Sequence, residues 1–308
     1  VYYLKLVIGA NISPHFISLE DVDSIKKSGG LNNDWDLTYT ILNTILSSYF
    51  DPYNRHISEH IIRGCGEKND HEVLNRTRST LRNCNRQVLQ NQLPRQNISK
   101  LYFNTKNKLA KNSPFLLNCG DVKSGNLAKR IFQEVYLGEG LFTEIYSEAP
   151  LFYRGGGYIN REKLIPAREQ LEYLTGKSTV SIATGRPEVE ADYALRKFSI
   201  YGMFRAVVTE DQIVEAEKIH QSSLRKPHPY ILERCREESG YSREDRVYYV
   251  GDMPDDMMAA AGAGVVPLGF VNEKTDVRSE EMDRYIRLLK KMGAYKVCTD
   301  FLQVLQII

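Results

Sequence analysis

Short apolar runs alternate with amphipathic segments through the second half of the chain. The apolar runs are rich in β-branched and aromatic residues, which favours buried strands, and they occupy residues 179–183, 206–208, 247–250, 264–269 and 295–298. Segments with apolar residues at helical spacing separate them, at residues 162–174, 187–198, 226–236 and 279–292. Strands that alternate with helices of ~10 residues predict a parallel, doubly wound α/β sheet.

The first half of the chain shows helical spacing and few strand signals. Residues 18–27 begin with a serine, carry acidic residues in the first turn and end with lysines, as helix termini prefer. Residues 37–46 and 124–137 also have apolar positions at helical spacing. We therefore expect an α-helical domain over residues 1–147, with any remnant of an N-terminal core segment, and an α/β core over residues 148–308.

A glycine-rich stretch, Arg154-Gly-Gly-Gly-Tyr158, follows the expected boundary. Such a loop can cradle a phosphate, but a P-loop continues with Lys-Ser/Thr, and this stretch does not. We therefore predict a flexible linker here.

Composition narrows the functional classes. The 308 residues are 42% hydrophobic, enough for a sizeable core, and the net charge of +2 gives no reason to expect a nucleic-acid partner. The five cysteines are scattered, without C-x-x-C spacing, as in reduced cytoplasmic proteins. No apolar run approaches the ~20 residues of a membrane span. We expect a cytoplasmic protein without a membrane partner; the oligomeric state stays open.

Three acidic residues follow the apolar run that ends at Val250, in the order Gly251-Asp252-Met-Pro-Asp255-Asp256. In a parallel α/β sheet, ligands bind at the carboxyl ends of strands. Carboxylates gathered there repel one another unless a cation lies among them, and hard oxygen ligands suit Mg²⁺. The alternative is that these acids cap a helix and favour its dipole. We predict metal binding by Asp252, Asp255 and Asp256.

Two further features fall near predicted strand ends. Thr184 and Gly185 follow an apolar run, and their hydroxyl and backbone N–H groups can hold phosphate oxygens. Lys226 precedes Pro227 and adds a fixed positive charge. Each feature is weak alone, but together they suit stabilisation of a phosphoryl group.

These three motifs resemble the second, third and fourth motifs of the haloacid dehalogenase-like (HAD) hydrolases. The matching segments are Ser-Ile-Ala-Thr184-Gly-Arg-Pro, Arg-Lys226-Pro-His-Pro and Tyr-Val-Gly-Asp252-Met-Pro-Asp-Asp256. The resemblance implies a Rossmann-like core in which Thr184 binds the transferring phosphoryl group and Lys226 balances its charge. It also implies that Asp252 and Asp256 hold Mg²⁺, with Asp255 as the alternative partner, and that Gly185 and Arg186 bind substrate.

The stretch Gly29-Gly-Leu-Asn-Asn-Asp-Trp-Asp-Leu-Thr38 is similar to the cap of a subgroup related to phosphoglycolate phosphatases. In such proteins an inserted helical cap closes over the site. Asn32, Asn33 and Trp35 are therefore candidate substrate contacts. The other interpretation is a turn in which one of the amides caps the following helix, and the sequence does not separate the two.

The family's first motif, Asp-x-Asp after a strand, supplies its nucleophile. Asp21-Val-Asp23 has the same letters, but it lies in a predicted first helical turn. We expect the nucleophile on a segment upstream of Val1. The predicted function is Mg²⁺-dependent hydrolysis of a small phosphorylated metabolite through an aspartyl-phosphate. The alternative is a catalytically inactive HAD-like protein that binds a phosphorylated ligand or a protein partner.

Overall fold

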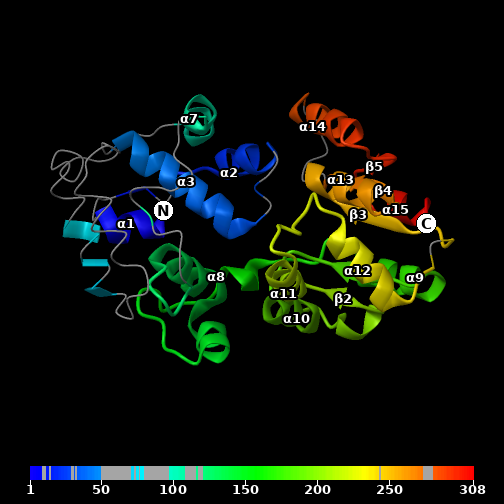
Figure 1. Cartoon of the computed structure of the whole chain (residues 1–308), viewed down its shortest axis with the longest axis horizontal. Helices are drawn as coiled ribbons and strands as arrows, with labels where there is room; N and C mark the ends of the chain where they lie inside the picture. Colours follow the sequence, from blue (N-terminus) through cyan, green and yellow to red (C-terminus); the bar gives the residue numbers. More distant parts are fainter. Residues whose placement is uncertain are drawn as a thin grey trace. The chain divides into compact units, whose positions relative to one another are not determined.

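A computed structural model describes residues 1–8, 12–13, 15–28, 31, 33–49, 71–72, 74–75, 77–79, 97–107, 116, 121–242, 244–272 and 280–308. The chain divides into two compact units, Val1–Arg161 (unit 1) and Glu162–Ile308 (unit 2). Figure 1 shows the elements of each. The role of the first part of the chain as a cap stays a prediction.

Unit 1 is helical in its described part. Its helices are α1 (Tyr2–Ile8), α2 (Leu19–Lys26), α3 (Asp34–Tyr49), α7 (Ile98–Thr105), α8 (Leu127–Tyr146) and the 3₁₀ turn η1 (Tyr158–Arg161). The α-helices among them share one hydrophobic core, in which Leu4, Ile45 and Ile98 are fully buried. Burial of an apolar face supplies most of the stability of such short helices.

Helix α2 begins with the serine cap that its sequence predicts. The Ser18 hydroxyl accepts the Asp21 backbone N–H, while the Asp21 carboxylate accepts the Ser18 N–H, which is a capping box. The same carboxylate accepts the backbone N–H of Ser99 at 2.8 Å and so joins α2 to α7. Asp21 therefore has a structural role in a helix start.

The predicted linker at residues 154–158 is wrong, because these glycines pack closely against α8. Gly138 interrupts α8 with φ 75° and forms an antiparallel bridge with Gly156. A Cβ atom on Gly157 would lie 2.1 Å from the carbonyl oxygen of Leu137. Glycine is needed here for the close approach of two backbones.

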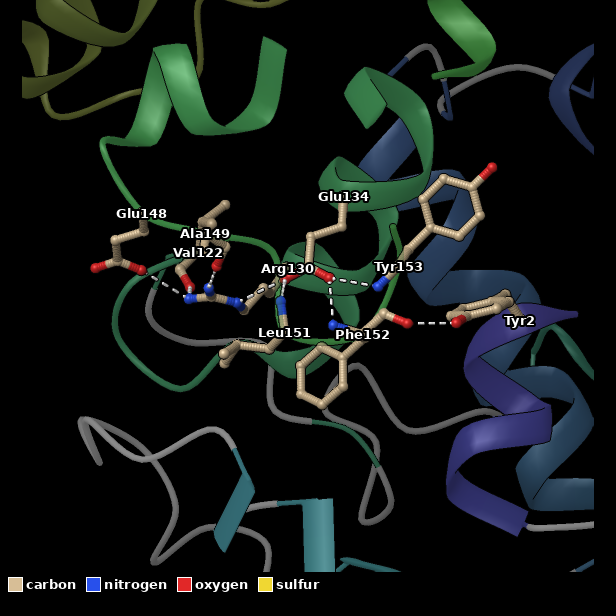
Figure 2. A network of polar contacts seen from close by, with 9 residues as sticks. All are labelled: Tyr2, Val122, Arg130, Glu134, Glu148, Ala149, Leu151, Phe152 and Tyr153. Carbon is tan, nitrogen blue, oxygen red and sulfur yellow. Dashed lines mark hydrogen bonds and ion pairs between the residues drawn. The ribbon is translucent and has the colours of Figure 1, made fainter. Parts of the chain in front are cut away.

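A buried carboxylate fastens the segment after α8 (Figure 2). Glu134 is 0% exposed and accepts the backbone N–H groups of Leu151, Phe152 and Tyr153 at 2.7–3.0 Å. Its other partner is Arg130, whose Nε donates to it at 2.9 Å. Arg130 also donates to Glu148 and to the carbonyl oxygens of Val122 and Ala149. The Tyr2 hydroxyl donates to the Phe152 carbonyl oxygen, which joins α1 to the same segment.

Unit 2 has the predicted α/β fold with parallel pairing. Strands β1 (Ile182–Ala183) and β2 (Val207–Val208) form one pair. Strands β3 (Tyr248–Gly251), β4 (Val266–Phe270) and β5 (Lys296–Cys298) form a second sheet in that order. The fold class expected from the alternating pattern is confirmed.

The helices of unit 2 lie between and after these strands in the sequence. They are α9 (Arg168–Lys177), α10 (Glu188–Lys197), η2 (Tyr201–Met203), α11 (Glu210–His220), α12 (Tyr230–Ser239), α13 (Pro254–Gly262), α14 (Glu280–Lys291) and α15 (Phe301–Leu305). The predicted helix at 162–174 starts later, after Pro166. The pattern also missed α11, although the Gln212 side chain accepts the Thr209 backbone N–H at its start.

Strands β1 and β3 each have an open edge in the described part of the chain. The N–H groups of Ile182 and Thr184 donate toward β2, so in a parallel ladder the polar groups of Ala183 point to the other side. Within the described ranges, no strand pairs with that edge or with the matching edge of β3. All residues of β1 and β3 are partly exposed, whereas Val208 and Leu268 in neighbouring strands are fully buried.

The glycine contact predicts unequal effects of two adjacent substitutions. Gly157→Ala should lower the free energy of unfolding by about 1–3 kcal/mol, because its Cβ would overlap the Leu137 carbonyl. Gly156→Ala should change it by less than ~0.5 kcal/mol, since no atom of the described part of the chain lies within 4 Å of its Cβ position. Thermal and denaturant unfolding measure both. Equal losses in the two variants would contradict the close approach.

The buried carboxylate generates a second prediction. Glu134→Gln should cost about 3 kcal/mol of unfolding free energy, because it removes one of the two carboxylates paired with Arg130 and an amide cannot accept all four hydrogen bonds of the buried carboxylate. Glu144→Gln, on the exposed part of α8, is the matched control and should be nearly neutral. Denaturant unfolding measures the difference. A Glu134→Gln protein as stable as the control would show that this network does not contribute to stability.

Candidate active site

Thr184 lies directly after β1, as the sequence predicts. Its backbone N–H donates to the Val208 carbonyl oxygen at 2.9 Å, which fixes its place at the strand end. Its Oγ1 accepts the backbone N–H of Arg186 at 3.2 Å. Among the described residues, nothing lies within 4 Å of a Cβ atom placed on Gly185. A ligand can therefore approach the backbone at this turn.

Arg186 makes a bidentate ion pair with Glu162. Its two terminal nitrogens lie 3.0 and 2.8 Å from the two carboxylate oxygens. Two parallel charge-assisted hydrogen bonds hold a guanidinium in a fixed plane. This pair joins the turn after β1 to the start of unit 2. The predicted contact of Arg186 with substrate stays a prediction, and its structural partner is now known.

Asp256 lies at the centre of the polar groups after β3. It belongs to the first turn of α13 and is 5% exposed. Its Oδ2 accepts the backbone N–H groups of Asp252 and Met253 at 3.1 and 3.0 Å. Its Oδ1 lies 2.8 Å from Lys226 Nζ and 3.2 Å from the Tyr249 hydroxyl. One carboxylate thus ends the strand, begins the helix and binds the lysine.

Gly251 makes this arrangement possible. A Cβ atom at residue 251 would lie 2.5 Å from Cβ of Asp256 and 2.6 Å from its Oδ2. Any larger side chain would displace the carboxylate from the amides that it accepts. The glycine of the motif is therefore explained by the space that Asp256 occupies.

Lys226 is anchored by two partners. Its ammonium lies 2.5 Å from the Tyr249 hydroxyl as well as 2.8 Å from Asp256. Burial opposes the charge, but the neighbouring Tyr249 and Asp256 outweigh it and raise the pKa of Lys226. Burial also raises the pKa of Tyr249 to about 12, with Lys226 acting in the opposite direction. Lys226 therefore stays a cation, and Tyr249 stays neutral, at physiological pH.

Tyr249 also reaches the end of β1. Its hydroxyl lies 3.5 Å from the carbonyl oxygen of Ala183, the residue before Thr184. The structure therefore brings the Thr184, Lys226 and Asp256 motifs to one place, with Tyr249 in contact with parts of all three. Tyr249 therefore connects β3 to the end of β1 through its side chain.

The three predicted metal ligands differ in environment. The Asp252 side chain is exposed, and its carbonyl oxygen accepts the Tyr285 hydroxyl at 2.6 Å. Asp255 and Asp256 are buried, at 6% and 5% exposure. In the part of the chain that the structure describes, no three His, Cys, Asp or Glu side chains converge on one metal position. Mg²⁺ commonly takes one or two carboxylates with waters and phosphate, and Asp252 at the strand end fits that smaller set.

The candidate cap residues belong to unit 1. Asn33 caps α3, because its side-chain oxygen accepts the backbone N–H groups of Trp35 and Asp36 at 2.8 and 3.3 Å. Trp35 lines a pocket of that unit and lies against the Lys129 ammonium. Asn32 lies outside the described residues.

Sequence reasoning missed Tyr249 and Glu162. The strand period of two places Tyr249 on the same side as Gly251, next to the acidic helix start, and this signal could have identified it. Glu162 lies far from any motif, and its pairing with Arg186 could not be derived from spacing.

None of the helices in the described ranges combines the length and the apolar character that a bilayer crossing requires.

Comparisons with known proteins agree with the α/β geometry. Residues 163–269 match the family model of the haloacid dehalogenase-like hydrolases. A structural-genomics target solved by X-ray crystallography is 19% identical, with a TM-score of 0.54, over 94% of this chain and 81% of its own. A HAD-superfamily hydrolase of subfamily IA from Geobacter sulfurreducens is 23% identical, with a TM-score of 0.33, over 46% of this chain and 58% of its own. No curated protein matches significantly.

The matched residues contain the strand-end threonine, the anchored lysine and the acidic helix start. Over these residues, the chain is therefore similar to the haloacid dehalogenase-like hydrolases.

Proposed function

We propose that the protein is a Mg²⁺-dependent phosphatase acting on a small phosphomonoester. The observation that carries the proposal is the Lys226 ammonium, held beside the ends of β1 and β3 by Asp256 and Tyr249. A fixed cation at such a position stabilises the negative charge of a phosphoryl group without reorganisation. Thr184 at the end of β1 supplies a hydroxyl and a backbone turn for the phosphate oxygens.

The roles of the acids follow from their environments. Asp252 would hold Mg²⁺ through its exposed carboxylate. Asp256 orients Lys226 and the Asp252 backbone, so it acts on the metal site through its neighbours; Asp255 remains the alternative ligand. When bound, Mg²⁺ would neutralise phosphate charge.

The nucleophile would come from a strand that pairs between β1 and β3. Among the described residues, both strands offer an open parallel edge, and a strand between them would end beside Thr184 and Lys226. A carboxylate at its end would attack phosphorus and release the alcohol, and water would then hydrolyse the aspartyl-phosphate. That the protein has a segment that forms this strand is itself proposed.

The alternative function is binding of a phosphorylated ligand or a protein partner without turnover. It needs the lysine and threonine but no nucleophile. Hydrolysis of p-nitrophenyl phosphate by protein purified from its native source, with and without Mg²⁺, separates the two. Turnover that requires Mg²⁺ supports the phosphatase, and tight vanadate binding without turnover supports the alternative. A cytoplasmic location stays a prediction that rests on the cysteine pattern.

Asp252→Asn tests the metal site. We expect the Mg²⁺ concentration for half-maximal activity, or for half-maximal Mg²⁺ binding by calorimetry, to rise at least about tenfold, since a formal ligand charge is lost. The melting temperature should hardly change, because the side chain is exposed. Asp245→Asn, another exposed acid in unit 2, is the control. An unchanged Mg²⁺ titration in Asp252→Asn would exclude this residue as a ligand.

Lys226→Met tests the phosphate site. We expect vanadate affinity to fall at least about tenfold, because the fixed positive charge is removed. Since Asp256 would lose its cation, the double variant Lys226→Met/Asp256→Asn separates ligand binding from folding. Lys218→Met, at an exposed position of α11, is the matched control. Vanadate binding as tight in both Lys226 variants as in the control would show that Lys226 does not face the phosphate.

A further inference from the structure

Unit 1 contains a pocket of about 170 Å³ between the first turns of α3 and α8. Helix α3 contributes Trp35, Thr38 and Tyr39, and the start of α8 contributes Asn126, Lys129 and Phe132. An apolar cavity of ~150 Å³ admits a benzene molecule. The pocket therefore has room for about one six-membered ring.

Three aromatic side chains form its apolar surface. Trp35, Tyr39 and Phe132 are only partly buried, so part of each ring remains accessible. The Phe132 ring stacks on Tyr136, with centroids 5.8 Å apart and an interplanar angle of 19°, which limits its orientations. Aromatic rings arranged in this way favour another flat ring by offset or edge-to-face contact.

A fixed cation stands beside these rings. Lys129 Nζ lies 3.8 Å from the centroid of the Trp35 ring and 2.8 Å from Asp121 Oδ1. Two opposing contacts hold the ammonium in place, so little side-chain entropy is lost when an anion joins it. Its side chain is 21% exposed, which leaves it accessible to a ligand.

The N-termini of α3 and α8 add partial positive charge to that of Lys129. The pocket lies at the first turns of two helices, where the macrodipole favours an anion. The side chains of Asn33 and Asn126 already cap these turns, so the dipoles act on a ligand through space. Asp36 also lines the pocket, but its side chain is exposed, and solvent screens it. Asp121 and Asp36 offset part of the positive charge, and Lys129 is the lining cation that an anionic group would contact.

We propose that this pocket binds a small molecule with one aromatic or heteroaromatic ring and one anionic substituent. The ring packs against Tyr39 and Phe132, and the anion meets the Lys129 ammonium. The inference goes beyond the catalytic proposal, because it concerns binding in unit 1 alone and requires no turnover.

The only tryptophan of the chain, Trp35, lies in this pocket, so intrinsic fluorescence reports on it directly. We would titrate the full chain with benzoate, which has a ring and an anion, and separately with benzyl alcohol and acetate, which have one each. None of these is a phosphomonoester, so hydrolysis cannot contribute. Benzoate should give a saturable change in emission with a Kd at least about tenfold below those of the other two.

Lys129→Met keeps the apolar stem and removes the charge, so it should bring the Kd of benzoate up to that of benzyl alcohol. Lys106→Met is the matched control, because Lys106 lies over Phe103 in the same unit at 5.3 Å without lining the pocket. Phe132→Leu should weaken benzoate and benzyl alcohol together while leaving acetate unchanged. Melting curves establish that each variant is folded, and Lys129→Gln replaces Lys129→Met if the latter unfolds.

Three results would overturn the proposal. The first is the absence of a saturable change with benzoate. The second is acetate binding as tightly as benzoate, which would indicate a surface cation only. The third is equal benzoate affinity in folded Lys129→Met and Lys106→Met.

Discussion

The Asp256 carboxylate is the interaction on which the geometry of unit 2 depends. It accepts two backbone N–H groups where β3 ends, begins α13, and holds Lys226 together with Tyr249. A buried charge is stable only when its hydrogen-bonding capacity is filled, so these four partners must be in place at once. Residue 251 must be glycine for the same reason, because only glycine leaves room for the Asp256 carboxylate. Lysine position, strand end and helix start are thus set by a single side chain.

Part of this could be predicted from sequence. Short apolar runs identified the strands, and the residues after them identified Thr184 and the acidic helix start, because strand ends meet at one edge in a parallel sheet. Lys226 lies before α12 rather than after a strand, and it was identified by the Lys-Pro pair and the spacing of the motifs. The alternation of side chains along β3 places Tyr249 on the same side as Gly251, but this signal was not used in predicting the site. The glycine-rich stretch at residues 154–158 was misread because composition does not distinguish a glycine required for mobility from one required for close contact. The Glu134 network and the Arg186–Glu162 pair join residues far apart in sequence, and local pattern carries no information about such contacts.

The two units gather different chemistry. Unit 2 holds a cation, a hydroxyl and carboxylates at strand ends, groups that suit phosphate and a hard metal ion. Unit 1 presents aromatic rings beside one ammonium, groups that suit a flat organic anion. Both rely on the same device, a lysine held rigid by a carboxylate and an aromatic residue: Lys226 with Asp256 and Tyr249, and Lys129 with Asp121 and Trp35.

The division of the sheet bears on the order of folding in unit 2. Paired positions are close in sequence within each half, as in Ile182 with Val207, Tyr248 with Val266 and Leu268 with Lys296. Contacts of short sequence separation form early, since little loop entropy opposes them. Each sheet can therefore assemble around its own crossover helices, and pairing of the proposed strand with both β1 and β3 would be the most non-local step. Until such a strand pairs with them, the two edges are templates for any extended chain nearby, which favours aggregation of the newly made protein.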